Sequence, residues 1–145
     1  MTDLTDLGIA GIRDGFRSGD FSAREVAEAF NAAVAGAKAL NAFIVETPDH
    51  AIAAAEQADR DRSEGTIKPL SGVPIGMKDL FCTKGVQTTA ASHILEGFTP
   101  EYESSVSARL WARWSACSTE VREVPGRQAG RRDDHWLELG GLTVG

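Results

Sequence analysis

Helical and extended patterns alternate along residues 1–112, and this order constrains the fold of the chain more than any other feature. Apolar residues recur at helical spacing over residues 5–18 and again, among many alanines, after Ser22. A short apolar run at 41–46 precedes a third helical stretch at 47–65, and a second apolar run follows at 73–78. Helices that alternate with short strands predict an α/β fold.

The residues at the ends of these stretches specify where each helix starts and stops. Ser22 and Glu25 have the spacing of a capping box, in which each side chain bonds the other residue's backbone N–H. Gly19 is placed to end the first helix, because glycine adopts the left-handed cap conformation without steric cost. Thr47 followed by Pro48 predicts the start of the third helix.

Two further features concern helix faces. The charges at 59–64 alternate in sign, which predicts a solvated face of the third helix. A last helix is predicted at about 103–112, after a long glycine-punctuated loop, with Val106 and Leu110 pointing inward.

Composition excludes several classes of protein. The 145 residues allow one domain with a modest core, and a net charge of -6 gives no general attraction to nucleic acid or anionic membranes. No apolar run reaches 18 residues, and the N-terminus lacks the pattern of a signal peptide. The two cysteines, Cys82 and Cys117, lack metal-ligand spacing, as do the three histidines. We therefore expect a cytoplasmic protein with no metal of its own.

The character of the sequence changes after Ala112. Residues 113–145 contain five arginines but no lysine, isoleucine or phenylalanine, and all four lysines come earlier. We find no clear helical or strand period from Glu120 to Asp134. The sequence thus predicts two parts, a domain segment at 1–112 and a tail at 113–145. The tail is either a polar extension or the out-of-frame translation of a GC-rich gene.

Lys78 ends the apolar run at 73–78 and is the residue with the most chemical interest. Burial of an ammonium is costly, so a lysine at the end of a buried strand is favoured in its neutral form. A neutral lysine can act as general base for a serine nucleophile. The alternative, from these residues alone, is a surface lysine whose stem covers apolar neighbours.

The residues around Lys78 resemble a known family. Gly72-Val73-Pro74-Ile75-Gly76-Met77-Lys78-Asp79 looks like the lysine segment of the amidase-signature enzymes. The resemblance covers roughly residues 5–112. Within the family, this segment is most similar to the A subunits of aspartyl/glutamyl-tRNA amidotransferases, a branch of that family. This narrower resemblance is carried by Leu40–Ile44, Phe81–Ser92, Leu95, Phe98, Pro100, Tyr102 and Val106.

The resemblance implies a fold and a mechanism. The fold would be the N-terminal part of the amidase-signature fold, a mixed sheet flanked by helices, and it would be incomplete. Lys78 would be the catalytic lysine of a Ser–Ser–Lys triad that hydrolyses glutamine. The ammonia would pass to partner subunits B and C, which use ATP and Mg²⁺ to amidate Glu-tRNA(Gln) or Asp-tRNA(Asn). This chain would bind no cofactor itself.

Both serines of that triad are missing from the sequence. The family carries them in glycine-rich stretches well beyond the lysine, and no Gly-Ser-Ser or Gly-Gly-Ser segment occurs in this chain. We therefore assign no nucleophile and expect the chain to be inactive alone. Two alternatives stay open, namely a standalone amidase acting on a small amide and an inert or merely binding fragment. The serines that lack the required context are Ser92, Ser104, Ser105, Ser115 and Ser118.

Other residues near Lys78 have two interpretations each. Asp79 would either orient Lys78 or cap the following turn. Thr88 and Thr89 would line a substrate pocket or simply form a turn. Cys82 is expected to be a small core residue rather than a nucleophile, because no basic partner is evident in its vicinity.

Overall fold

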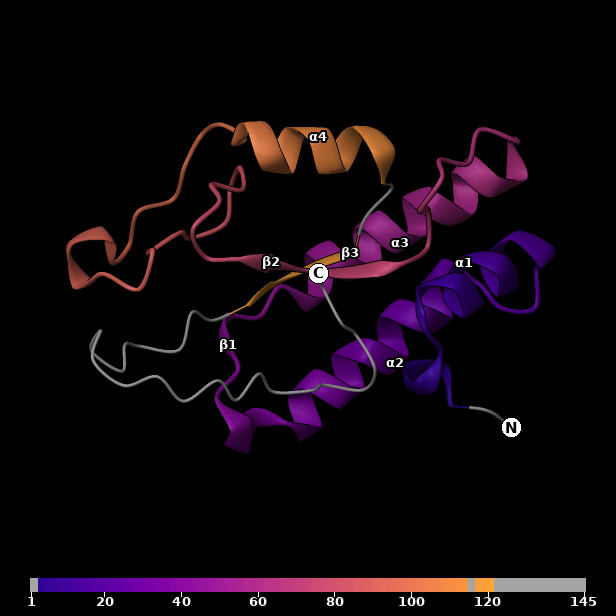
Figure 1. Ribbon diagram of the computed structural model, residues 1–145, viewed down its shortest axis with the longest axis horizontal. Coiled ribbons are helices and arrows are strands. Elements are labelled where there is room, and N and C mark those ends of the chain that lie inside the picture. Colours follow the sequence, from indigo (N-terminus) through magenta and orange to yellow (C-terminus); the bar gives the residue numbers. More distant parts are fainter. Residues whose placement is uncertain (1–2, 115–116, 122–145) are drawn as a thin grey trace, which may run out of the picture.

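The computed structural model describes residues 3–114 and 117–121 of the chain. Helices and strands alternate in it, which confirms the α/β class (Figure 1). The α-helices are α1 (Ile9–Ser18), α2 (Ala23–Gly36), α3 (Pro48–Ser63) and α4 (Ser105–Arg113). The strands are β1 (Phe43–Val45), β2 (Pro74–Lys78) and β3 (Cys117–Val121). Short 3-10 turns lie at Leu4–Asp6, Lys38–Leu40 and His93–Leu95.

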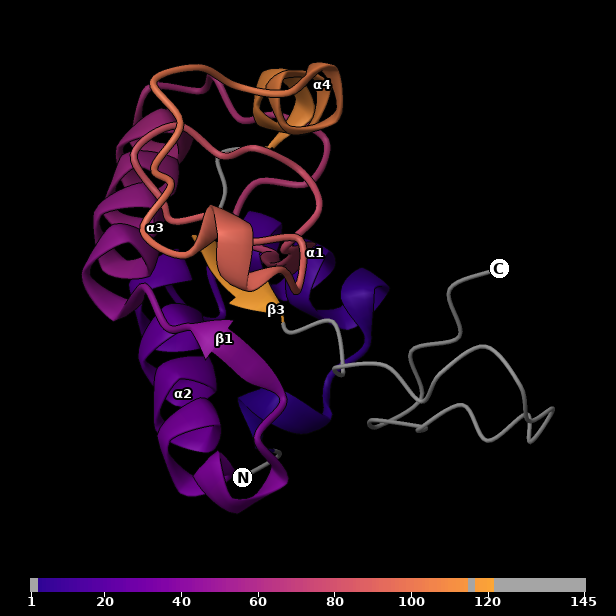
Figure 2. The same cartoon turned by 90° about the vertical axis from the view of Figure 1, so that its left-hand side faces the viewer.

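The described strands form one mixed sheet in the order β1-β3-β2. Strand β3 pairs with β1 antiparallel and with β2 parallel, so β1 and β2 lie at the two edges. In both Figure 1 and Figure 2, α4 lies above the strands and α2 lies below them. This arrangement agrees with the expected mixed sheet flanked by helices.

Strand β3 lies near the start of the tail, and only its last two residues fall in the stretch from Glu120 to Asp134 where the sequence indicated no helical or strand period. Its residues have no clear alternating pattern, but its backbone pairs along both neighbours, from Pro74↔Cys117 to Lys78↔Val121 on the β2 side. Ladder hydrogen bonds between backbones therefore define this strand, and side-chain periodicity could not reveal it. The rest of the tail lies outside the described residues.

The signals at the helix ends are largely confirmed. Gly19 has a φ of 84° and ends α1. The Ser22 side chain accepts from the Glu25 N–H at 3.1 Å, and the Glu25 carboxylate accepts from the Ser22 N–H at 2.7 Å. Pro48 opens α3 as predicted, although Thr47 forms no side-chain cap there.

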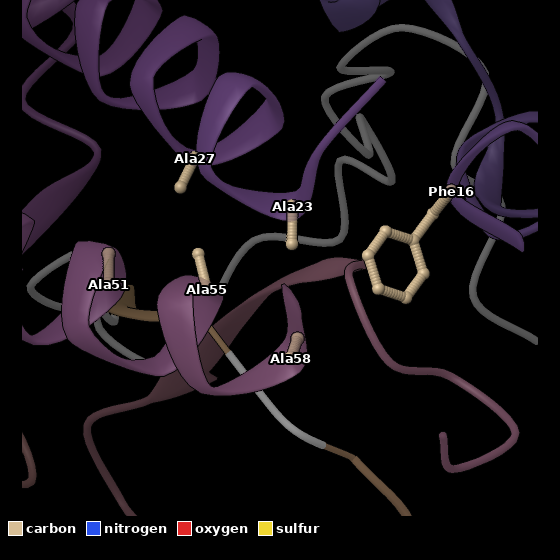
Figure 3. Close-up of a cluster of buried hydrophobic side chains, with 6 residues drawn as sticks. All are labelled: Phe16, Ala23, Ala27, Ala51, Ala55 and Ala58. Carbon is tan, nitrogen blue, oxygen red and sulfur yellow. The ribbon is translucent and has the colours of Figure 1, made fainter. Parts of the chain in front are cut away.

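Alanines allow α2 and α3 to pack closely. Figure 3 shows the small side chains of one helix facing those of the other, with the Phe16 ring closing one end. Side chains of this size let two helix backbones approach, and each alanine also favours helix intrinsically. The buried cluster consists of Phe16, Ala23, Ala27, Ala51, Ala55 and Ala58.

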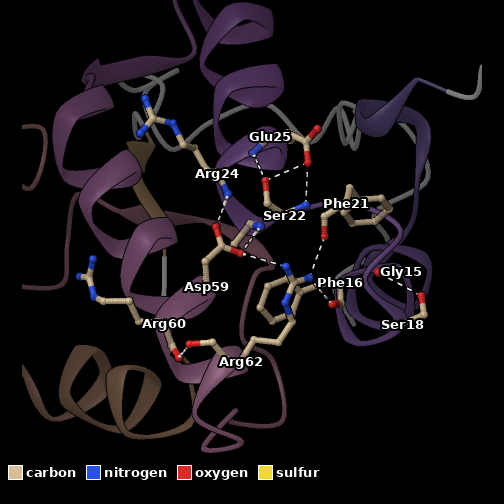
Figure 4. A network of polar contacts seen from close by, with 12 residues as sticks. Gly15, Phe16, Ser18, Phe21, Ser22, Arg24, Glu25, Asp59, Arg60 and Arg62 are labelled. Atoms are coloured by element: carbon tan, nitrogen blue, oxygen red, sulfur yellow. Dashed lines mark hydrogen bonds and ion pairs between the residues drawn. The ribbon is translucent and has the colours of Figure 1, made fainter.

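The predicted solvated face at 59–64 is wrong for two of its residues. Asp59 accepts from the N–H groups of Ala23 at 2.9 Å and Arg24 at 3.2 Å, which otherwise have no partner within α2. Arg62 donates to the carbonyls of Phe16 at 2.7 Å and Phe21 at 2.9 Å (Figure 4). Both side chains are half-buried, because they bond free backbone groups at the turn between α1 and α2.

Gly72 joins this helical body to β2. Its φ is +81°, and a Cβ built there would lie 2.7 Å from Cγ of Phe16. Both the backbone conformation and the close ring therefore require glycine at this position. Val73, which follows, is buried with Ile12 and Val26 in a second apolar cluster.

Helix α4 differs from its predicted orientation. Val106 is exposed and Leu110 is only half-buried, whereas Ser107 is fully buried. The Ser107 hydroxyl donates to the Cys82 carbonyl at 2.9 Å, which turns that face of the helix inward. No helix within the described residues is long and apolar enough to cross a membrane.

Candidate active site

Lys78 is the last residue of β2, and its side chain is exposed. Side chains alternate across a strand, so Met77 and Asp79 are buried on the opposite side. Of the two interpretations of Lys78, the described residues therefore agree with a surface lysine rather than with a desolvated one. Only one face of β2 is buried, and the Lys78 side chain lies on the other, exposed face.

Asp79 is completely buried and organises the loop that follows β2. Its carboxylate accepts from the N–H of Thr89 at 2.7 Å, from the N–H of Ala91 at 3.3 Å, and from the Thr89 hydroxyl. Its carbonyl accepts from the Ala90 N–H at 3.0 Å. A buried carboxylate needs several donors of this kind. The turn-forming interpretation of Asp79 and Thr89 therefore holds, and the bonds close a loop of about ten residues.

The loop held by Asp79 is strained. Ala90 and Ala91 have φ values of 47° and 55°, in the left-handed region that residues with a Cβ rarely occupy. Such a conformation persists only where surrounding interactions over-determine it. Here the bonds from residues 89–91 to Asp79 supply that restraint, directly beside Lys78.

The same loop is tied to the start of α4. The Cys82 carbonyl accepts from the Ser104 N–H at 2.8 Å as well as from Ser107. Cys82 is half-buried rather than a core residue, and its thiol donates to the Tyr102 hydroxyl at 3.7 Å. The neighbouring thiol raises the pKa of Tyr102. These bonds make Cys82 a connection between the loop and α4.

Two of the serine hydroxyls near this loop, those of Ser92 and Ser104, are used in a turn and a helix cap. Ser92 accepts from the Ile94 N–H, and Ser104 caps α4 by accepting from Ser107. Thr88 is buried and bonds the Val86 carbonyl at 3.4 Å. None of these side chains has the glycine-rich context of a family nucleophile, and Ser115 lies outside the described residues.

A cavity of about 500 Å³ lies elsewhere, between α3 and α4. Trp111, Trp114, Lys68 and Asp61 are among its lining residues, and Lys78 is not. The Lys68 ammonium donates to the Trp111 carbonyl at 3.0 Å, and the Trp114 indole donates to the Val73 carbonyl at 2.7 Å. These bonds show that the polar groups of the cavity hold α4 against the body.

The described part of the chain contains no group of three or more His, Cys, Asp or Glu side chains that could hold a metal ion. Of the two described histidines, His93 lies on the surface and faces Glu96 at 3.5 Å. The third histidine, His135, lies outside the described residues.

The fold and the lysine at the end of β2 define a class of protein. The sequence model of the amidase family matches residues 25–113, and the chain belongs to that family. A solved bacterial aryl acylamidase of the amidase-signature enzymes has the same fold over 83% of this chain, with a TM-score of 0.73 at 23% identity.

Within the family, the chain is similar to proteins named as the A subunit of glutamyl-tRNA(Gln) amidotransferase. It is 74% identical over 112 residues to the protein of that name from Rhizorhabdus wittichii and 78% identical over 111 residues to that from Sphingopyxis alaskensis. Each match covers 77% of this chain but only 23% and 22% of the relative. The chain therefore spans under a quarter of the length of these relatives, and its resemblance to the A subunits is confirmed for that part.

Proposed function

We propose that this chain is the lysine-bearing N-terminal segment of an A subunit of glutamyl-tRNA(Gln)/aspartyl-tRNA(Asn) amidotransferase. The observation that carries the proposal is the 74–78% identity to relatives with the first of these names. The family match includes Lys78 and the Asp79-anchored loop. The whole enzyme would hydrolyse glutamine and supply ammonia for the amidation of mischarged tRNA in the cytoplasm.

Lys78 would act as the general base of that hydrolysis. Its amine would take a proton from a bridging serine, which in turn would take the proton of the nucleophilic serine. The nucleophilic oxygen would attack the side-chain carbonyl carbon of glutamine, and the C–N bond would break to release ammonia. Water would then hydrolyse the acyl ester to glutamate.

The exposure of Lys78 limits what the described residues can do alone. A general base must be neutral, and removal from water favours the neutral amine over the ammonium. Residues 3–114 do not shield the Lys78 amine from water, and they do not supply the two triad serines. We therefore propose that the chain has no glutaminase activity until a further part of the enzyme covers Lys78 and contributes both hydroxyls.

The partners and cofactors follow from the same proposal. Subunits B and C of the complex would receive the ammonia and handle Glu-tRNA(Gln) or Asp-tRNA(Asn). ATP and Mg²⁺ would be used by those subunits rather than by this chain. The net charge of -6 also favours a tRNA site on a partner.

A fused enzyme tests the role of Lys78. Residues 1–112 replace the matching segment of the Sphingopyxis alaskensis relative, and ammonia release from glutamine is measured with that organism's other subunits present. We expect activity that Lys78→Ala lowers by about 10³-fold or more. Lys84→Ala is the matched control, because Lys84 is an exposed lysine on the same loop. Its activity should equal that of the parent.

Three outcomes would contradict parts of the proposal. Equal activity of Lys78→Ala and Lys84→Ala would remove Lys78 from the mechanism. Hydrolysis of small amides without the other subunits would favour the standalone amidase. Ammonia release by the 145-residue chain alone, lost in Lys78→Ala, would show that the chain carries its own nucleophile.

A further inference from the structure

The cavity of about 500 Å³ between α3 and α4 has the size of a binding site for a small organic molecule. Such sites typically have volumes of about 300–1,000 Å³ and combine aromatic or apolar walls with a few polar groups. Lys78 does not line this cavity, so the cavity is separate from the candidate active site. The polar and aromatic side chains that line it are Gln57, Asp61, Thr66, Lys68, Trp111 and Trp114.

Local structure brings these side chains together from three segments. Gln57 and Asp61 lie four residues apart in α3 and therefore on one face of that helix. The Thr66 N–H donates to the Asp61 carbonyl at 2.8 Å, which turns the chain back beside this face. Trp111 lies in the last turn of α4, and Trp114 follows directly after the helix. The cavity therefore has a mainly polar side, formed by α3 and the loop after it, and an aromatic side at the end of α4.

Two hydrogen bonds fix the aromatic side in place. The Lys68 ammonium donates to the Trp111 carbonyl at 3.0 Å, and the Trp114 indole donates to the Val73 carbonyl at 2.7 Å. The Trp114 bond uses the only N–H of that indole, so what Trp114 offers a ligand is its aromatic ring. An ammonium has three N–H donors, so Lys68 can bond an anion while it holds Trp111. A cavity that is preorganised in this way loses little conformational entropy when a ligand binds.

The charges that line the cavity select the kind of ligand. Asp61 contributes a carboxylate and Lys68 an ammonium, and both side chains are half-buried. A purely cationic ligand would be repelled by Lys68, and a purely anionic ligand would be repelled by Asp61. A zwitterion matches both charges, because its ammonium can pair with Asp61 and its carboxylate with Lys68. The two indoles add large flat surfaces that favour an aromatic group on the same ligand.

We propose that the cavity between α3 and α4 binds a small aromatic zwitterion, of which a free aromatic amino acid is the simplest example. The amidase family match ends at residue 113, so Trp114 lies outside it. The site therefore depends on the junction between the family segment and the tail, and it does not depend on the proposed function.

Tryptophan fluorescence of the 145-residue chain tests the inference. A Trp136→Phe variant serves as the parent, because Trp111 and Trp114 are then its only tryptophans. It is titrated at neutral pH with L-phenylalanine, with phenethylamine, which has the ammonium alone, and with 3-phenylpropionate, which has the carboxylate alone. We expect a saturable change with L-phenylalanine, with a Kd on the order of 1 mM. The other two ligands should bind roughly tenfold or more weakly.

Substitutions then assign the binding to the cavity. Asp61→Asn should weaken L-phenylalanine roughly tenfold without weakening 3-phenylpropionate, a selective change that a general loss of structure would not produce. Asp49→Asn is the matched control, because Asp49 is an exposed aspartate of the same helix that does not line the cavity. It should bind as the parent does. The absence of a saturable change with L-phenylalanine, equal affinities for the three ligands, or equal effects of the two substitutions would each overturn the inference.

Discussion

The helical body formed by α1, α2 and α3 and the segment 80–106 differ in how much of its apolar surface each buries. In the body, α2 and α3 bury a row of alanines, and Asp59 and Arg62 bond backbone groups of the neighbouring turn. In the segment 80–106, backbone bonds are made but six large apolar side chains stay exposed. The difference shows that a segment can have a hydrogen-bonded backbone while several of its large hydrophobic residues stay exposed. Substitutions can separate the two kinds of stability.

The largest effect is expected at the junction of the two regions. Gly72→Ala should lower the free energy of unfolding by about 2–5 kcal/mol, because it combines a left-handed φ with a contact against Phe16. Gly85→Ala is the matched control, with a φ of +78° and open space around it. Gly85→Ala should lower the free energy of unfolding by only about 1–2 kcal/mol. Urea unfolding measures both, and equal losses would show that the contact with Phe16 has no effect.

Asp79→Asn should loosen the loop and leave the helical body intact. The loss of charge-assisted bonds costs about 1.5–3 kcal/mol, and the new amide group would face the donor N–H of Thr89. Amide chemical shifts of Ala90 and Ala91 should move toward those of an unstructured loop, while α2 and α3 keep theirs. Shift changes spread evenly over both regions would contradict a local role for Asp79.

Arg62→Ala removes a side chain that stabilises the helical body and changes no contact of the segment 80–106. It leaves the carbonyls of Phe16 and Phe21 without their donor and should cost about 1–3 kcal/mol. Arg60→Ala removes an exposed arginine from the same helix, which bonds Gln57, and should cost about 0.5 kcal/mol or less. Thermal unfolding of the two variants should therefore differ, and identical curves would contradict the structural role of Arg62.

The smallest effect concerns pH. Bonds from Ser22 lower the pKa of Glu25 below its usual 4.5. A lowered folded-state pKa stabilises the protein above the unfolded value, and this stabilisation is lost as pH falls through the folded value. Glu25→Gln should therefore reduce the fall in Tm between about pH 6 and pH 3. An unchanged pH profile would show that the capping box does not depend on the charge.

The sequence predicted most of the local structure and little of the environment of the site. Gly19, Ser22 with Glu25, and Pro48 specify helix ends through contacts within a few residues, and all three signals are found in place. Lys78 was predicted at the end of a strand, which is correct, but the sequence left open whether it is buried or exposed, and the structure shows it exposed. The composition of a strand does not reveal which of its faces the rest of the protein covers.

By itself the sequence determined the α/β class, the helix boundaries and the family, because these depend on neighbouring residues and on motif spacing. Only the tertiary structure decided that Asp79 anchors residues 89–91, that Asp59 caps a helix 36 residues away, and that β3 lies between β1 and β2. These contacts join residues far apart in the chain. Their energies depend on distance and burial in the folded protein, which no local pattern encodes.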